Sequence, residues 1–195
     1  MTALRTAAVG DLDAIMALEE ASFPADAWSV RTMRDELDSP HGRYVVLEHD
    51  GAVVGYAGLR AVPGSRDGDI QTIAVAEASR GRGWGRMLLD ELLAEAVQRG
   101  VRDLFLEVRA DNPVAQALYL SEGFREVGRK PRYYQPDDVD AIVMQADLRG
   151  RVAHPPCRTP QESAVSAGNG AESAERAQID GVLNGDPSEG AANDR

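Results

Sequence analysis

The 195-residue sequence is poor in cysteine, in basic relative to acidic residues, and in long apolar runs. Its single cysteine, Cys157, cannot form an internal disulfide, which favours a reducing compartment. The formal net charge of −11 argues against nucleic-acid binding, because such surfaces need clustered Lys and Arg. No apolar segment is long enough to cross a bilayer, and the N-terminus lacks a signal-peptide pattern. The three scattered histidines predict no metal site. We therefore expect a cytoplasmic protein that binds neither nucleic acid, membrane nor metal.

The composition changes near Gly150. From Arg151 to Arg195 the chain is dominated by Ala, Gly, Ser, Pro, Asn and Glu and has no aromatic residue. Such a segment buries too little apolar surface to offset the entropy of ordering it. We predict one folded domain over residues 1–149 and a disordered tail over residues 150–195. A short helix around Ala171–Leu183 that docks on a partner is the alternative for part of the tail.

Before the tail, strand and helix periodicities alternate. Strands are expected at Leu4–Ala7, Tyr44–Glu48, Ala52–Leu59, Asp69–Val75, Asp103–Arg109, Phe124–Tyr133 and Ala141–Ala146. Helices are expected around Leu12–Leu18, from Ser29, over Gly85–Arg99 and over Pro113–Ser121. Asp50-Gly51 predicts a hairpin turn, and Ser29, preceded by Trp28, predicts a capped helix start. This order predicts an α/β (α+β) fold in which helices cover a mixed sheet.

A glycine-rich turn, Arg80-Gly81-Arg82-Gly83-Trp84-Gly85, lies between an apolar strand and a long helix. Three glycines allow a tight turn that directs several N–H groups to one place, and the helix N-terminus adds partial positive charge there. Arg80, Arg82 and Arg86 add full charges. The turn therefore predicts a pyrophosphate site, with a plain strand-to-helix connector as the alternative. A Walker loop is excluded by the missing Gly-Lys-Ser/Thr, and a Rossmann loop would need glycine at Arg86.

Two patterns in the chain are Arg80-x-x-Gly83-x-Gly85 and Asn112-x-x-Ala115-x-x-x-Tyr119-x-x-x-Gly123-Phe124. The first resembles the acetyl-CoA signature of the GNAT superfamily of N-acetyltransferases, and the second resembles the second signature of the same superfamily. The resemblance covers Thr2 to about Asp147 and implies a mostly antiparallel sheet flanked by helices, with acetyl-CoA as co-substrate and no metal. The residues that it implies for cofactor binding are Ile73, Ala74, Val75, Gly81, Arg82, Gly83, Trp84, Gly85, Arg86 and Asn112.

Other runs resemble the RimI-type ribosomal-protein-alanine N-acetyltransferases. These runs are Leu106-Glu107-Val108-Arg109, Phe23-Pro24 with Trp28-Ser29, and Arg132-Tyr133-Tyr134 leading to Asp140–Met144. This type implies acetylation of the N-terminal alanine of a small-subunit ribosomal protein, a basic partner that an acidic domain would attract. The sequence departs from the type by inserting Ala25-Asp26-Ala27 between Pro24 and Trp28. There are two alternatives. One is an enzyme that acetylates a small amine or a lysine side chain, and the other is a catalytically silent module that binds acetyl-CoA.

Glu107 is the candidate general base. In an extended strand Phe105, Glu107 and Arg109 share one face. The alternative is a surface ion pair between Glu107 and Arg109. The resemblance favours catalysis, in which Glu107 would take the proton directly or through a water. Arg129, Lys130 and Arg132 are interpreted as a solvated strand face.

Tyr119 is the candidate general acid, on one helix face with Pro113 and Gln116. From this position its phenol could reach a departing thiolate, and the alternative is a tyrosine packed in the core. Asn112 before Pro113 is also the preferred order for a helix cap, so a dual role is expected there. A pure cofactor sensor would need neither Glu107 nor Tyr119. Pro24, Trp28 and Tyr133-Tyr134 would by resemblance wall the acceptor cleft.

Overall fold

A computed structural model of the chain describes residues 1–151. The predicted tail beyond residue 151 and the alternative helix around Ala171–Leu183 lie outside these residues. The strands are β1 (Thr2–Thr6), β2 (Gly42–His49), β3 (Ala52–Arg60), β4 (Asp67–Val75), β5 (Asp103–Arg109), β6 (Arg125–Tyr134) and β7 (Val139–Asp147). The α-helices are α1 (Leu12–Ser22), α2 (Val30–Leu37), α3 (Trp84–Gln98) and α4 (Pro113–Ser121), and short 3-10 turns occupy Val9–Asp11 and Glu77–Ser79.

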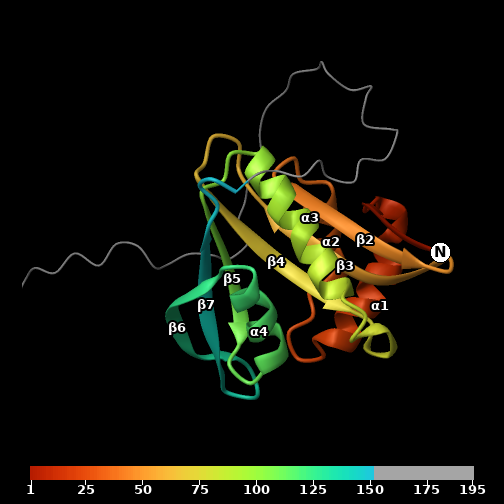
Figure 1. Cartoon of the computed structure of the whole chain (residues 1–195). Helices are drawn as coiled ribbons and strands as arrows, with labels where there is room; N and C mark the ends of the chain where they lie inside the picture. The colour runs from red at the N-terminus through yellow and green to blue at the C-terminus, as the bar shows by residue number, and fades with distance from the viewer. Residues whose placement is uncertain (152–195) are drawn as a thin grey trace, which may run out of the picture. The chain divides into compact units, whose positions relative to one another are not determined.

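The seven strands form one sheet in the order β1-β2-β3-β4-β5-β7-β6 (Figure 1). All neighbouring pairs are antiparallel except β4 and β5, which are parallel. The predicted mixed and mostly antiparallel sheet is therefore confirmed. No helix of the described part is long and apolar enough to span a membrane.

Helices cover both faces of this sheet. Successive residues of β2 alternate between two cores: Val45 packs in the core under α3 and α4, and Val46 packs in the core under α1 and α2. Because side chains alternate across a strand, these cores lie on opposite faces. The first contains Leu88 and Leu92 of α3, and the second contains Ile15 of α1.

Two helix caps and one hairpin turn form at the residues that the sequence predicts. The Ser29 hydroxyl accepts a hydrogen bond from the Thr32 N–H at 3.0 Å, so Ser29 caps α2 as expected. Asp50 and Gly51 have φ of 50° and 81°, the left-handed pair that a two-residue hairpin turn requires. Asn112 caps α4, because its Oδ1 accepts from the Ala115 N–H at 3.1 Å.

One irregularity shapes the centre of the sheet. β4 and β5 are paired only from Asp67 opposite Asp103 to Ile70 opposite Leu106, although both strands continue beyond these residues. A register shift against β3 lies at the same level, where Gly58 faces Thr72 but Leu59 faces Ile70. Such a bulge bends the strand that carries the extra residue, here β4. The two strands consequently separate toward their C-terminal ends, as Figure 1 shows.

Candidate active site

The separated end of β4 presents backbone groups to a ligand. The Ala76 N–H donates to the Val54 carbonyl at 2.8 Å, and Ala74 faces Tyr56 across the same ladder. Since an antiparallel strand alternates the direction of its backbone groups, Ile73 and Val75 direct theirs away from β3, toward the side where β5 has separated. An extended ligand arm can add to this edge through backbone hydrogen bonds. One of these groups, the Val75 carbonyl, accepts from Arg80 Nε at 3.1 Å.

The glycine turn leads from this edge into α3. Gly81 and Gly83 have φ of 79° and 80°, a conformation that side chains disfavour, and Gly83 caps the helix. The first intrahelical bond runs from the Met87 N–H to the Gly83 carbonyl, so the amides at the start of α3 have no intrahelical acceptor. The Trp84 side chain is buried, with its ring 4.9 Å from that of His49. Only the backbone of Trp84 is therefore available to a phosphate.

The three arginines of this region differ in their partners. Arg82 lies 5.2 Å from the centre of the Trp84 ring, at the turn itself. Arg86 points instead to the end of α4, where it binds the Ser121 hydroxyl at 2.9 Å and the Glu122 carboxylate. Because Glu122 balances its charge, Arg86 is placed to contribute to a phosphate site chiefly through its backbone N–H.

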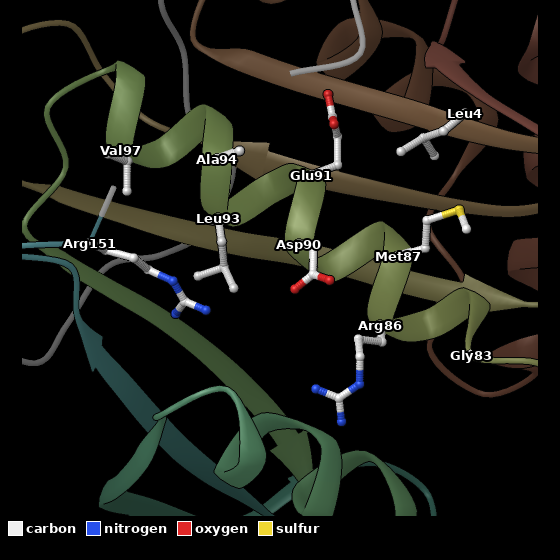
Figure 2. A pocket seen from close by; sticks show the side chains of 10 residues that line it. All are labelled: Leu4, Gly83, Arg86, Met87, Asp90, Glu91, Leu93, Ala94, Val97 and Arg151. Atoms are coloured by element: carbon white, nitrogen blue, oxygen red, sulfur yellow. The ribbon is translucent and has the colours of Figure 1, made fainter. Parts of the chain in front are cut away.

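A groove of about 840 Å³ runs along α3 (Figure 2). Gly83 and Arg86 lie at one end of its lining, and Val97 and Arg151 line it further along. Asp90 also contributes to its lining, which makes the middle of the groove unsuited to an anion. None of its lining residues comes from β4 or β5. The groove therefore touches the glycine turn but is separate from the strand edge that carries Ile73 and Val75.

Glu107 lies on the face of β5 that is opposite the α3 and α4 core. Its neighbours Leu106 and Val108 belong to that core, and Glu107 itself is 29% exposed. Its Oε1 accepts from Lys130 Nζ of β6 at 2.5 Å. β7 lies between the two strands, with Ala141 in register with Lys130 and Val143 in register with Glu107, so the ion pair crosses β7 diagonally.

This ion pair corrects two interpretations made from the sequence. A Glu107–Arg109 pair is wrong, because Arg109 binds Asp111 and Asp137, each at 3.0 Å. The interpretation of Arg129, Lys130 and Arg132 as a solvated strand face is wrong for Lys130, which pairs with Glu107. It holds for Arg129, which is exposed and pairs with its neighbour Glu126. Spacing along β5 could not reveal Lys130, which comes from β6, or Asp137, which comes from the turn after β6, although Asp111 lies only two residues beyond Arg109.

Tyr119 is buried on the opposite side of the sheet. It is 9% exposed, and its ring packs edge-on against Phe124 with centres 5.9 Å apart. Burial raises the pKa of Tyr119 to about 12, so the hydroxyl keeps its proton at neutral pH. The same helix approaches the glycine turn, because a Leu118 methyl lies 3.6 Å from where a Cβ on Gly85 would stand. Tyr119 therefore packs in the core and stays protonated, and its role as the general acid stays a prediction.

The two catalytic candidates lie on opposite faces of the sheet, on either side of the separated strands. A thioester held along the edge of β4 would have Tyr119 on the side of the glycine turn and Glu107 on the other. Such a site can take a proton from an amine on one face and give a proton to a thiolate on the other. This separation suits an acyl transfer, which needs a base and an acid at the same time.

The face that carries Glu107 is walled by the α1–α2 loop and the end of β6. Asp26, within the inserted residues, lies 3.8 Å from Arg109, and the Trp28 N–H donates to Glu19 at 3.0 Å. On β6, the Tyr133 ring centre is 5.0 Å from Lys130 Nζ, and the Tyr134 ring centre is 5.1 Å from the Arg109 guanidinium. The insertion is thus held at its middle residue, Asp26, and at Trp28, the residue that follows it.

Sequence reasoning missed two residues of this site. Glu19 is almost completely buried on the apolar stripe of α1 and also accepts a hydrogen bond from the Tyr56 hydroxyl. A charged residue on an otherwise apolar helix stripe is a signal that could have identified it. Lys130 left no such signal, because β6 is exposed along most of its length and shows no alternation. Among residues 1–151 no group of three or more His, Cys, Asp or Glu side chains could hold a metal ion.

A substitution at Tyr119 tests its role. We expect Tyr119→Phe to lower kcat by roughly tenfold or more with little change in acetyl-CoA affinity, because only the proton donor is lost. The ring and its contact with Phe124 remain, so the fold should persist. Steady-state kinetics with calorimetry would check this result, and an unchanged kcat would assign Tyr119 to packing alone.

The chain is similar to a known protein family, to named relatives and to a solved structure. Residues 12–124 match the model of the acetyltransferase (GNAT) family. The N-alpha-acetyltransferase RimI of Mycobacterium tuberculosis is 43% identical over 124 residues, which cover 63% of this chain and 77% of that protein. The ribosomal protein bS18-alanine N-acetyltransferase of Escherichia coli is 35% identical over 69% of this chain and 89% of its own length. A crystal structure of the Escherichia coli ribosomal-protein-S18-alanine enzyme superposes with a TM-score of 0.69, at 32% identity, covering 76% of this chain and 94% of that one.

Proposed function

Because the chain belongs to the acetyltransferase (GNAT) family and is therefore an N-acetyltransferase, we propose that it transfers the acetyl group of acetyl-CoA to the α-amine of a protein N-terminus. The acceptor we propose is the N-terminal alanine of a small-subunit ribosomal protein, in the cytoplasm. The observation that carries the proposal is the placement of Glu107 and Tyr119 on opposite sides of the separated β4 and β5. The names of the relatives from Mycobacterium tuberculosis and Escherichia coli support the choice of acceptor.

In this proposal the cofactor lies along β4 and ends at the glycine turn. Backbone groups of Ile73 and Val75 would hold the pantetheine arm, and the amides that follow Gly83 at the start of α3 would hold the pyrophosphate. Arg82 would add a full positive charge beside the turn. Ala74 differs from the expectation for it, because its backbone groups are directed to Tyr56 of β3 and would not hold the arm.

On the other face, Glu107 would accept the proton of the acceptor amine. An α-amine has a pKa of about 7.7–8.0 and a lysine ε-amine about 10.4, so at pH 7 roughly a tenth of the first and under a thousandth of the second is free base. A single carboxylate base therefore has a much easier task with an N-terminus. The formal charge of −11 for the whole chain would also favour encounter with a basic ribosomal protein.

The acceptor is tested with a peptide that begins with Ala, a basic residue and an aromatic residue and contains one internal lysine. We expect acetylation only at the first nitrogen, located by mass spectrometry. The same peptide with a blocked N-terminus should give no turnover, because the lysine is protonated at neutral pH. If the blocked peptide reacts as fast as the free one, or if a polyamine outcompetes both, the acceptor is a different amine.

A further inference from the structure

The general-base candidate is already ion-paired, and the partner is the only lysine of the 195-residue chain. We propose that Lys130 is a positioning residue that balances the charge of Glu107 and thereby makes the site select a neutral α-amine over a protonated amine. The inference rests on the proposed function, because it concerns the acceptor that Glu107 deprotonates.

Lys130 is held in place by two contacts. Its Nζ lies 2.5 Å from Glu107 Oε1 and 5.0 Å from the centre of the Tyr133 ring, so a carboxylate and an aromatic face contact the same ammonium. Its backbone lies just before a register shift between β6 and β7, which spans Lys130 to Tyr134. The bulge brings Tyr133 onto the side of the strand where Lys130 lies. Lys130 on Oε1 thus fixes the orientation of Glu107, and burial, followed by the charge of Glu107 and a hydrogen bond with it, raises the pKa of Tyr133 beside the pair.

Two other cations near this face, Arg109 and Arg60, have carboxylate partners of their own. Arg109 binds Asp111 and Asp137, and Arg60 of β3 binds Glu36 at 3.1 Å. Asp69 of β4 adds negative charge beside Glu107, and burial together with Asp67 and Glu107 raises its pKa. Within residues 1–151, Lys130 is thus the cation in direct contact with Glu107, and its removal would leave an unbalanced acidic site.

An unbalanced carboxylate would bind the wrong form of the acceptor. Most α-amines carry a proton at pH 7, and an ammonium bound to a free carboxylate is stabilised without becoming a nucleophile. Binding the ground state more tightly in this way lowers KM and does not help the chemical step. With Lys130 present, the pair gains little from a second cation, whereas a neutral amine can still donate its N–H to a lone pair of the Glu107 carboxylate that Lys130 does not occupy.

Lys130 is not itself an acceptor in this arrangement. Its hydrogen bond to Glu107 raises its pKa above the usual value for lysine, so it stays an ammonium without a free electron pair. Because the chain has no second lysine, mass spectrometry of the enzyme after turnover reports directly on this point. We expect Lys130 to remain unmodified, and its acetylation during turnover would overturn the proposal.

The decisive variant is Lys130→Met, which keeps most of the length of the side chain and removes its charge. The pair is about a third exposed and worth at most about 1 kcal/mol, so we expect KM for the acceptor peptide to fall by up to about fivefold. We expect kcat to fall by roughly tenfold, since the bound amine is protonated more often and Glu107 loses its orientation. Lys130→Arg should restore both values, because a cation returns to the same place.

A matched control and a simple probe complete the test. Arg129→Met removes the neighbouring cation, which pairs with Glu126 away from the site, and should leave both constants unchanged. n-Butylammonium, a mimic of a protonated amine, should inhibit Lys130→Met several-fold more strongly than the wild type or Lys130→Arg. A KM that rises or stays constant in Lys130→Met, or a failure of Lys130→Arg to restore it, would overturn the proposal. If the wild-type protein does not acetylate the peptide at all, the proposed function is wrong. This result is distinct from any difference between the wild type and the Lys130 variants.

Discussion

We expect Glu107→Gln to lower kcat by roughly 10²–10⁴-fold at neutral pH, the range of a lost general base. The amide keeps an oxygen that can accept the hydrogen bond from Lys130, so the geometry of the pair should persist. What is lost is the ability to take a proton from the acceptor amine. Steady-state kinetics with an N-terminal alanine peptide would measure the effect, and circular dichroism would verify the fold.

The matched control for this variant is Glu126→Gln. Glu126 is an exposed carboxylate of β6 that pairs with Arg129, so its replacement should leave kcat near the wild-type value. A kcat for Glu107→Gln that stays within about threefold of wild type from about pH 6 to 9 would show that Glu107 is not the base. The acceptor amine would then lose its proton to another group or to water.

Gly83→Val should reduce acetyl-CoA affinity by well over tenfold while leaving the core intact. Gly83 has φ of 80°, which a β-branched residue adopts only under strain, so the turn must change shape. A Cβ at this position meets no atom of the protein within 4 Å, so the side chain would project into open space where a phosphate would lie. Isothermal titration calorimetry would measure the loss of affinity.

Gly10→Val is the control for a new side chain at an exposed glycine. Gly10 also has no atom within 4 Å of an added Cβ, but it lacks a positive φ and is remote in sequence from the turn. Its acetyl-CoA affinity should match that of wild type. An unchanged affinity in a folded Gly83→Val protein would place the pyrophosphate elsewhere. The two predictions are separable, since the Glu107 variant should lose turnover and the Gly83 variant should lose cofactor binding.

Much of the fold was readable from the sequence because its signals are local. The Asp50-Gly51 hairpin and the helix of Pro113–Ser121 with its Asn112 cap depend on a few adjacent residues. The glycine turn likewise contains within six residues the positive φ angles and the helix start that define it. Strand β5 was predicted with its observed bounds, and the alternation along it places Glu107 opposite the core. The roles assigned to these residues in binding and catalysis stay predictions that the experiments above test.

The tertiary structure alone decided which partners these residues meet. Lys130 meets Glu107 because β7 lies between β5 and β6 with Ala141 in register with Lys130 and Val143 in register with Glu107, and no stretch of sequence states this register. Arg86 turns from the glycine turn to Glu122 because α4 ends beside α3. The sequence by itself determined the elements, their caps and the residue types that can perform the chemistry, because these depend on neighbours along the chain. Strand order and register decide three further features: the separation of β4 from β5, the side of the sheet on which Glu107 and Tyr119 lie, and the charge balance of Glu107. Only folding brings the residues behind these features together.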